Sequence, residues 1–441
     1  MKGFARTPNY YPALVAVISL AMKEEIKRIS DDSDGKITKL LNFYTNEVDS
    51  YFYHPYVLFS GAHHYKIKDF HKNYRIGKDT SLFVDSGGYQ VATGVMKDKK
   101  YDADLIYNWA KDVAKANILP ILDNPLKADS IFKDHLSFTS NNAKHFADRK
   151  AFDEKNGNIN HDFNILNIVQ GNNANHITDW YDEVKQYKLD GWAHGGHDRK
   201  MKPVITTLMH LWQNGEFKRE KTIPYHIFGT GSIDNWLYIA YMQMKFNQKG
   251  VDIQLSADNS NANFASANGM FMAPVKTHTE SYVRLKLNRK ENLEKKLAKL
   301  EALEDGTPGK AKDLAKVKQE IIDYDFDFKN AEKVPMFCDC VACSLCDSMN
   351  DLIENSRLYY LIITLHNIIS NIRIKKQIDS LVFIGIPEVY PEMFLQKVVN
   401  NFKVIDSVFE NPKKANSIMS MFTESAVKKK ENIETSLDGW T

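Results

Sequence analysis

A carboxylate, two glycines and an aromatic residue follow one another where a short apolar run ends. The run covers residues 81–84, and Asp85-Ser86-Gly87-Gly88-Tyr89-Gln90 comes directly after it. Glycines behind a strand let backbone N–H groups approach a ligand closely, where side chains would collide. An acid, an accessible backbone and a flat ring suit a planar ligand that forms hydrogen bonds, such as a nucleobase. The same residues also fit an ordinary turn from a strand into a helix.

Three cysteines and a histidine have the spacing of a closed tetrahedral zinc site. The expected ligands are Cys338, Cys340, Cys343 and His366. Three thiolates and one imidazole leave no open position on the metal, so such a zinc, one per chain, is structural rather than catalytic. Cys346 leaves two alternatives open, a site that uses Cys346 in place of His366 and an iron–sulfur cluster.

Short apolar runs recur along the chain, with helical stretches such as 102–115 and 177–187 between them. We interpret eight of these runs as strands: residues 13–20, 56–60, 82–85, 118–123, 163–170, 191–195, 225–229 and 253–258. Alternating strands and helices, with strands that are almost continuously apolar, indicate a parallel sheet. Eight such units in roughly 250 residues predict a (β/α)8 TIM barrel.

Several of these strands end in polar or glycine-rich residues. In a barrel the carboxyl-terminal ends of all strands lie on one face, where active sites are built. We therefore expect the carboxylates of Asp85, Asp123 and Asp258 to converge on one pocket.

Two aspartates of the last strand compete for a place in that pocket. Asp252 stands at the start of the strand and Asp258 at its end. Because a reactive group belongs at the carboxyl-terminal end, we expect Asp258 in the pocket and interpret Asp252 as a strand-start or capping residue.

The region between the last strand and the cysteines predicts a helical hairpin. Apolar residues recur at helical spacing on both sides of a turn at 305–309, within residues 289–324. Lysines of this region could bind phosphates: Lys295, Lys296, Lys299, Lys312, Lys316 and Lys318. We favour the alternative, a solvated pair of helices in which glutamates balance these lysines. The expected division is a barrel (1–280), an inserted hairpin (281–330), a zinc-binding subdomain completing the barrel (331–375) and an α-rich extension with a loose tail (376–441).

The composition is that of a globular protein. The chain has 441 residues, of which 43% are hydrophobic and 26% charged, and a net charge of +2. This small charge neither requires nor excludes a nucleic-acid partner. The apolar stretch 13–22 is too short for a membrane span and lacks a cleavage site, so we expect no membrane partner and a cytoplasmic location.

The order and spacing of six motifs make the chain resemble the tRNA-guanine transglycosylases and their phage-type DNA-guanine transglycosylase relatives. The motifs are residues 85–90, 122–125, 168–171, 191–196, 228–231 and the Cys/His cluster. The resemblance covers residues 13–373. It implies an enzyme, a pentosyltransferase that exchanges a guanine in a polynucleotide for a free 7-deazaguanine base (preQ0-like) without cutting the backbone.

The resemblance also implies the catalytic groups. Asp258, which the archaeal-type pattern selects as well, would attack C1′ of the nucleotide and form a covalent glycosyl-enzyme, as in retaining glycosidases. Asp85 would be the second acid and base, which protonates the departing guanine and deprotonates the incoming base.

A base pocket follows from the same resemblance. Its residues would be Ser86, Gly87, Tyr89, Asp123, Gln170, Gly195 and Gly196. Asp123 would accept from N1–H and the exocyclic amine, Gln170 and the Gly196 N–H would donate toward O6, and Tyr89 would stack on the ring. Two simpler interpretations are that Asp123 is a turn residue before Pro125 and that Gln170 is a buried, satisfied amide.

The expected polymer is DNA rather than tRNA. The Leu-Pro-Thr-Arg segment that follows the nucleophile in bacterial tRNA-modifying relatives is missing here, and we find no recognisable RNA-binding appendix. The alternatives are the same exchange on tRNA, of the queuine or archaeosine type, and a non-catalytic accessory subunit. The presence of both Asp85 and Asp258 argues against the last one. The oligomeric state stays open.

Overall fold

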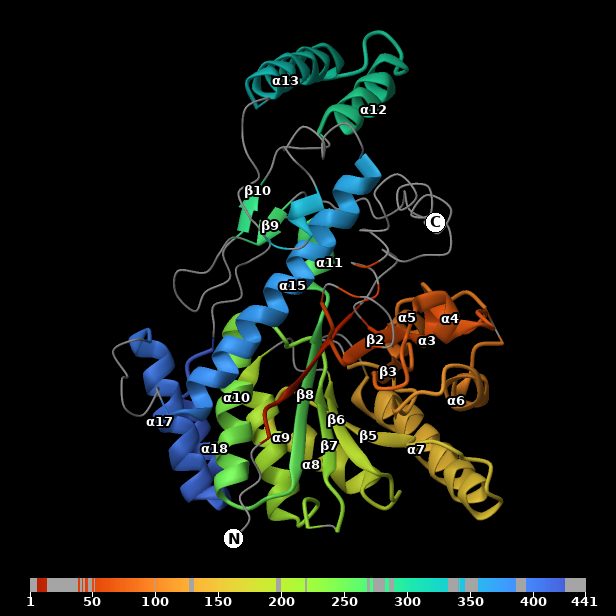
Figure 1. The fold of residues 1–441 in the computed structure, drawn as a ribbon, viewed down its shortest axis with the longest axis vertical. Coiled ribbons are helices and arrows are strands. Elements are labelled where there is room, and N and C mark those ends of the chain that lie inside the picture. Colours follow the sequence, from red (N-terminus) through yellow and green to blue (C-terminus); the bar gives the residue numbers. More distant parts are fainter. Residues whose placement is uncertain are drawn as a thin grey trace.

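Eight parallel strands form a nearly closed barrel in the computed structural model of the chain, with helices between them (Figure 1). In chain order the strands are β1 (Asn9–Pro12), β2 (Tyr56–Ser60), β3 (Ser81–Asp85), β4 (Ile118–Pro120), β5 (Asn164–Gln170), β6 (Gly191–Gly195), β7 (Ile223–Ile227) and β8 (Ile253–Asn259). Consecutive strands pair from β2 to β8, and β8 pairs with β1. A bridge between Ala13 and Leu58 brings β1 back to β2. The predicted (β/α)8 barrel is confirmed.

The structure describes residues 6–13, 39, 42, 44–46, 50, 52–98, 100–126, 131–195, 200–218, 220–267, 270–272, 282–284, 289–331, 340, 342–345, 356–385 and 394–424. Over these residues, none of the helices combines the length and the apolar composition that a membrane crossing requires.

Side chains that cap helices begin several of the segments between strands. Asp102, Asn173 and Ser232 each accept a hydrogen bond from the backbone N–H three residues later, at 2.8, 3.0 and 3.4 Å. Such a cap stabilises a helix by typically ~1 kcal/mol. The helices between the strands are α3 (Gly61–His64), α4 (Phe70–Tyr74), α5 (Gly88–Ala92), α6 (Ala103–Asn108) with the π-helical turn η2 (Trp109–Val113), α7 (Phe132–Lys155), α8 (Ala174–Val184), α9 (Met201–Gln213) and α10 (Ile233–Gln248).

The first barrel strand lies before the run predicted for it. We expected this strand at residues 13–20, but the strand that pairs with β8 is Asn9–Pro12, and residues 14–20 lie outside the described ranges. The reason is that β1 is short and aromatic rather than aliphatic. Tyr11 faces Phe83 inside the barrel at a ring-centroid distance of 5.5 Å, while Tyr10 packs against Trp236 of α10 at 5.7 Å.

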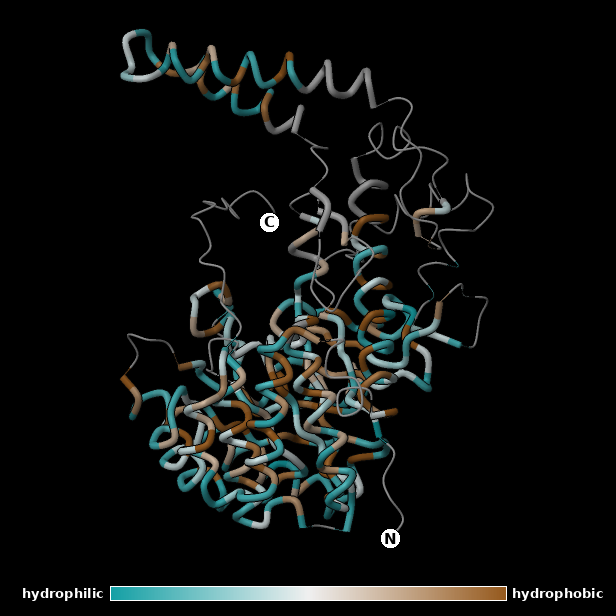
Figure 2. Tube along the Cα trace, turned by 90° about the vertical axis from the view of Figure 1, so that its left-hand side faces the viewer, coloured by the Kyte–Doolittle hydropathy of each residue, from teal (hydrophilic) through white to brown (hydrophobic). Residues whose placement is uncertain are grey.

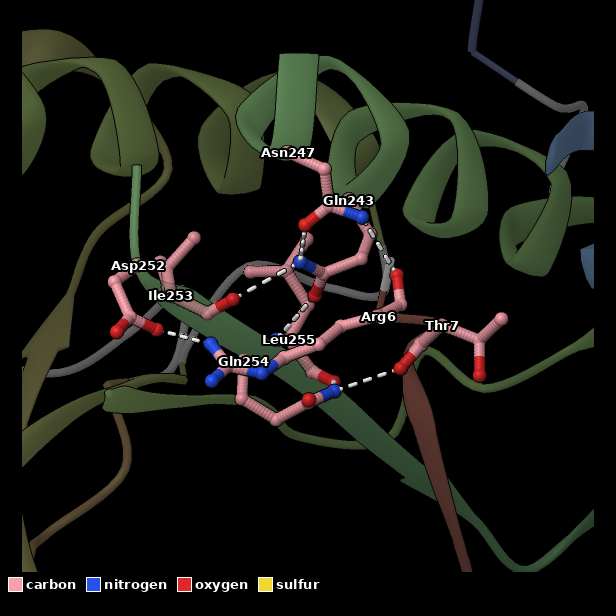
Figure 3. A network of polar contacts seen from close by, with 8 residues as sticks. All are labelled: Arg6, Thr7, Gln243, Asn247, Asp252, Ile253, Gln254 and Leu255. Atoms are coloured by element: carbon pink, nitrogen blue, oxygen red, sulfur yellow. Dashed lines mark hydrogen bonds and ion pairs between the residues drawn. The ribbon is translucent and has the colours of Figure 1, made fainter. Parts of the chain in front are cut away.

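A network of polar contacts attaches the amino-terminal segment to the start of β8 (Figure 3). Arg6 pairs with Asp252, and the Asn247 side chain donates to the Arg6 carbonyl at 2.7 Å. Gln254 donates to the Thr7 carbonyl at 2.8 Å. Asp252 is therefore a strand-start residue, as expected, and it lies at the opposite end of β8 from Asp258.

Helices outside the barrel extend the molecule beyond β8. In chain order these elements are α11 (Asn261–Ala267), the antiparallel ribbon β9 (Met270–Met272) and β10 (Tyr282–Arg284), α12 (Arg289–Glu301), α13 (Lys310–Ala331), the turn η3 (Cys343–Leu345), α15 (Ser356–Phe383), α17 (Gln396–Glu410), η5 (Pro412–Lys414), α18 (Ala415–Ile418) and η6 (Met419–Met421). The long helix α15 packs along α10 and α11. Its amino-terminal end points away from the barrel (Figure 1).

Helices α12 and α13 form the predicted hairpin. They pack on each other through buried Leu293 and Val317, and they stand apart from the barrel, beyond α11 and the ribbon (Figures 1 and 2). The colours of Figure 2 show hydrophilic residues along much of the hairpin. The domain boundaries expected from the sequence stay predictions.

Candidate functional site

Asp85 ends β3, and the glycine loop behind it bends back toward its carboxylate. The Gly87 N–H donates to Asp85 Oδ1 at 3.2 Å. Gly87 has a φ of +81°, and a Cβ atom there would lie 2.6 Å from Ala62 Cβ, so only glycine fits this turn. Burial raises the pKa of Asp85 to about 6, and the negative charge of Asp258 acts in the same direction. Asp85 is therefore a carboxyl group that gains and loses its proton near neutral pH.

Asp123 follows β4 and lies against the same loop. A Cβ atom on Gly88 would be 2.3 Å from Asp123 Oδ1 and 2.3 Å from the Asp123 carbonyl oxygen. Burial, together with the negative charge of Asp85, raises the pKa of Asp123 to about 7. The loop after Asp85 and the segment that carries Asp123 therefore lie directly against each other.

Gln170 ends β5 and is bonded to Asp123. Its side chain is fully buried, and Nε2 donates to Asp123 Oδ2 at 2.6 Å and to the Asn124 carbonyl at 3.2 Å. Its Oε1 accepts from the Leu126 N–H at 2.6 Å. The amide is satisfied within the protein, which is the simpler of the two interpretations made from the sequence. Its donation toward a base stays a prediction.

Asp258 lies at the end of β8, where the glycine loop after β7 donates two backbone hydrogen bonds to it. Oδ1 accepts from the Gly229 N–H at 2.8 Å and lies 3.2 Å from Nε2 of His226. The Gly231 N–H donates to the Asp258 carbonyl at 2.8 Å. The Asp258 side chain keeps 15% of its surface exposed. Its negative charge raises the pKa of Asp85, so the two carboxylates lie close enough to interact electrostatically. The three predicted carboxylates therefore do gather on one face of the barrel.

His226 is a site residue that the sequence reasoning missed. It comes from β7 and is fully buried, and its ring packs against those of Phe83 and Phe228 at centroid distances of 4.2 and 4.9 Å. Its Nδ1 lies 2.9 Å from Ser256 Oγ and its Nε2 faces Asp258. The signal in the sequence was a histidine three residues before the first glycine of the loop after β7, inside an otherwise apolar run.

The Ser86 hydroxyl forms a hydrogen bond within the protein rather than facing a ligand. Its side chain is buried, and its hydroxyl donates to the Ile121 carbonyl at 3.0 Å. The Tyr101 hydroxyl donates to the Ser86 carbonyl at 2.6 Å. These bonds hold the end of β3 against the segment after β4, so Ser86 supports the pocket through the backbone.

Two further predicted base-binding residues are Tyr89 and Gly195. Tyr89, on α5, has 61% of its surface exposed. A Cβ atom on Gly195 would be 3.9 Å from both Gln170 Cγ and Phe228 Cδ2, which is ordinary van der Waals contact, so the end of β6 lies against these two side chains. Gly196 lies outside the described residues.

Two buried acceptor atoms on the segments that follow β3 and β4 have no hydrogen-bond partner among the described residues. They are Gln90 Oε1, on α5, and Asn124 Oδ1, next to Asp123. Since buried polar atoms are nearly always bonded, such atoms indicate a place where a polar ligand or water binds.

A second group of side chains could hold a metal ion. The ligand atoms of Cys340, Cys343 and His366 all lie within 4.8 Å of one another, and all three residues are buried. His366 Nδ1 is 3.3 Å from each of the two sulfur atoms. A tetrahedral zinc, with bonds of about 2.0–2.3 Å, separates its ligand atoms by roughly 3.3–3.8 Å. The residues therefore fit such an ion, with one further ligand.

The second nitrogen of His366 is fixed by a contact of its own. Nε2 lies 2.9 Å from the Met272 carbonyl of β9, so it carries the proton, and Nδ1 is the nitrogen whose lone pair faces the two sulfur atoms and could bind a metal. Hydrogen bonding with Cys343, together with His366, lowers the pKa of the Cys340 thiol to about 3. The predicted ligand Cys338 and the alternative ligand Cys346 lie outside the described residues.

No protein-family model matches the chain, and no curated protein matches it.

Proposed function

We propose that the protein is a guanine transglycosylase that exchanges a guanine in DNA for a free 7-deazaguanine base. The observation that carries the proposal is the set of three strand-end carboxylates with different environments. Burial and mutual repulsion raise the pKa of Asp85 to about 6 and that of Asp123 to about 7, while Asp258 is held by a backbone N–H. Pairs of carboxyl groups whose environments differ in this way are typical of acid–base chemistry. A (β/α)8 barrel is also a fold that enzymes commonly use.

In the proposed reaction Asp258 is the nucleophile. An oxygen of its carboxylate forms a bond to C1′ as the bond from C1′ to N9 of guanine breaks, and the electron pair of that bond stays on N9. Asp85 then supplies the proton that the departing guanine takes up. The resulting Asp85 carboxylate removes a proton from the incoming base, whose nitrogen attacks C1′ and releases Asp258. A pKa of about 6 suits a group that must do both near neutral pH.

Asp123 is the proposed recognition group for the base. Its carboxylate would accept hydrogen bonds from N1–H and the exocyclic amine, and two donors would favour its ionised form. Asn124 Oδ1 and Gln90 Oε1, which have no partner within the described residues, are further acceptors on the segments that follow β4 and β3. The exposed ring of Tyr89 and the ring of Phe228 are the aromatic surfaces available for stacking on the base.

The choice of DNA over tRNA rests on the segment after Asp258. This segment continues as Asn259-Ser260-Asn261 and lacks the Leu-Pro-Thr-Arg residues of the bacterial tRNA-guanine transglycosylases that the sequence resembles. The alternative is the same exchange on tRNA. Retention of both reactive carboxylates argues against a non-catalytic accessory subunit.

Zinc is the proposed metal of the Cys/His site, with Cys338 as the fourth ligand. Bound there, it would supply no chemistry to the reaction, because a fully coordinated zinc is structural. Cys340, Cys343 and His366 would connect η3 to α15, and the hydrogen bond from His366 would attach β9 to the same unit.

The experiment that tests the proposal is an exchange assay. Purified protein is incubated with radiolabelled guanine and with duplex DNA, single-stranded DNA or tRNA, and the label in the polymer is counted. We expect incorporation into DNA, and none with the Asp258→Asn variant. Incorporation only into tRNA would move the substrate to RNA, and incorporation into no polymer would refute the proposed function.

A further inference from the structure

Two hydrogen bonds connect Asp258 to the interior of the barrel. His226 Nε2 lies 3.2 Å from Asp258 Oδ1, and His226 Nδ1 lies 2.9 Å from Ser256 Oγ. Ser256 and Asp258 are two residues apart on β8, so their side chains lie on the same face of the sheet. The pairing of β7 with β8 places His226 beside Ser256. Ser256, His226 and Asp258 thus form one continuous line that ends at the proposed nucleophile.

The proton positions along this line follow from what each group can donate. A carboxylate only accepts, so Nε2 of His226 must carry the proton that points to Asp258. In a neutral ring Nδ1 is then unprotonated and accepts a hydrogen bond, which the Ser256 hydroxyl donates. If the ring is instead protonated on both nitrogens, the Ser256 hydroxyl can turn to the Tyr225 carbonyl, 3.3 Å away. In the alternative Nδ1–H tautomer, the lone pair of Nε2 would face the carboxylate oxygen and repel it.

We propose that His226 is a positioning residue for Asp258, held in its Nε2–H form by Ser256. This inference rests on the proposed function. The Nε2–H of His226 and the N–H of Gly229 both bind Oδ1. They leave Oδ2 as the oxygen that forms the bond to C1′.

The same two donors serve the second half of the reaction. In the glycosyl-enzyme, Oδ1 is the carbonyl oxygen of the ester, and both donors remain beside it. When the incoming base attacks C1′, the electron pair of the broken C1′–Oδ2 bond returns to the carboxylate, whose charge is shared with Oδ1. Fixed donors at an atom that gains charge lower the barrier. The aromatic rings of Phe83 and Phe228 keep the imidazole in place for both steps.

The tautomer is tested first, without any assay of activity. In protein labelled with nitrogen-15 histidine, the ring resonances of His226 are assigned by their loss in His226→Gln. We expect a protonated Nε2 and an unprotonated Nδ1 in the neutral ring. Ser256→Ala should weaken this preference, whereas Thr207→Ala should leave it intact, because Thr207 Oγ1 contacts a different histidine, Nδ1 of His194, at 3.1 Å. A proton on Nδ1 of neutral His226 would overturn the proposal.

Three substitutions of His226 then separate positioning from packing. The Gln side chain carries an amide N–H to about the place of Nε2, the Asn side chain only to that of Nδ1, and Phe fills the space without donating. We expect kcat to fall on the order of 10- to 100-fold in His226→Phe and His226→Asn, with KM for DNA near the wild-type value, and to recover largely in His226→Gln. Urea unfolding of each variant identifies any that fail to fold.

The outcomes separate the two proposals. If Gln is as slow as Phe while both fold, or if Asn is as fast as Gln, His226 does not position Asp258. If the wild-type protein exchanges no base in any polymer, the proposed function fails, and the nitrogen-15 measurement still decides whether Ser256 fixes the tautomer of His226.

Discussion

Gly88 lies so close to Asp123 that a side chain of any size would collide with it. A Cβ atom on Gly88 would be 2.3 Å from Asp123 Oδ1 and from the Asp123 carbonyl oxygen. Because the clash involves backbone as well as side-chain atoms, it cannot be relieved by a rotamer change alone. The first residue of α5 and the segment after β4 are therefore positioned by one contact.

This contact predicts that Gly88→Ala displaces the carboxylate proposed to bind the base. We expect the exchange activity of Gly88→Ala to fall by more than its loss of stability explains, chiefly through a higher KM for the 7-deazaguanine base. Gly157→Ala is the matched control. It has a φ of +66° but open space around its Cβ position, so it should lose about 1 kcal/mol of stability and keep its activity. Equal activities of the two variants would contradict the contact as a determinant of the pocket.

The raised pKa of Asp123 predicts that this residue costs stability at neutral and alkaline pH. The folded-state pKa of about 7 lies above the ordinary 3.8, so the folded protein binds an extra proton between these values, and stability falls as the pH rises through that window. Asp123→Asn should be more stable than the wild type at pH 8, by on the order of 1–3 kcal/mol. The difference should nearly vanish at pH 4. Urea unfolding at both pH values measures it, and an Asn variant that is less stable than the wild type at pH 8 would show that the carboxylate is instead stabilised by its neighbours.

The two aspartates of β8 predict opposite results on substitution. Asp258→Asn should abolish exchange and the covalent protein–DNA adduct seen after denaturation, while the unfolding transition stays near that of the wild type. Asp252→Asn should keep the activity and lose some stability, because it breaks the pair with Arg6 at the start of the strand. An active Asp258→Asn protein with an inactive Asp252→Asn protein would mean that the wrong end of β8 was assigned to the reaction.

The strands with the clearest apolar patterns were predictable from the sequence, and tertiary hydrogen bonds were not. β2 and β6 begin and end where the apolar runs do. The first strand was predicted at the wrong residues. Tyr10 and Tyr11 are buried by neighbouring aromatic rings, and a search for aliphatic runs does not detect such a strand.

For the site, residue type and strand-end position predicted which carboxylates meet, since all parallel strands of a barrel end on one face. The same reasoning could not show that the Ser86 hydroxyl is bonded to the Ile121 carbonyl or that Gln170 is bonded to the Leu126 N–H, because these partners come from neighbouring strands and loops. It also passed over His226, whose importance depends on a contact with the next strand.

The Cys/His group predicts one zinc ion per chain. Because metal binding is coupled to folding, Cys340→Ala should lose the metal and much of the soluble yield, and a strong chelator should lower the melting temperature of the wild type. Metal analysis of His366→Ala and Cys346→Ala separates the possible ligand sets. Loss of zinc only in His366→Ala supports the proposed set, whereas loss only in Cys346→Ala, or iron in the wild type, would refute it.

The last prediction concerns how the polymer is held. In a duplex the neighbouring nucleotides obstruct C1′ of the target, so the guanine must leave the stack before Asp258 reaches it, at a cost of a few kcal/mol. A guanine opposite a mismatch has already lost part of this stacking and pairing energy. It should therefore react at least as fast as a paired guanine in the same sequence. Binding through phosphate contacts releases counterions, so exchange at low DNA concentration should fall steeply between about 50 and 200 mM salt. A mismatched guanine that reacts more slowly, or exchange that does not respond to salt, would contradict this mode of binding.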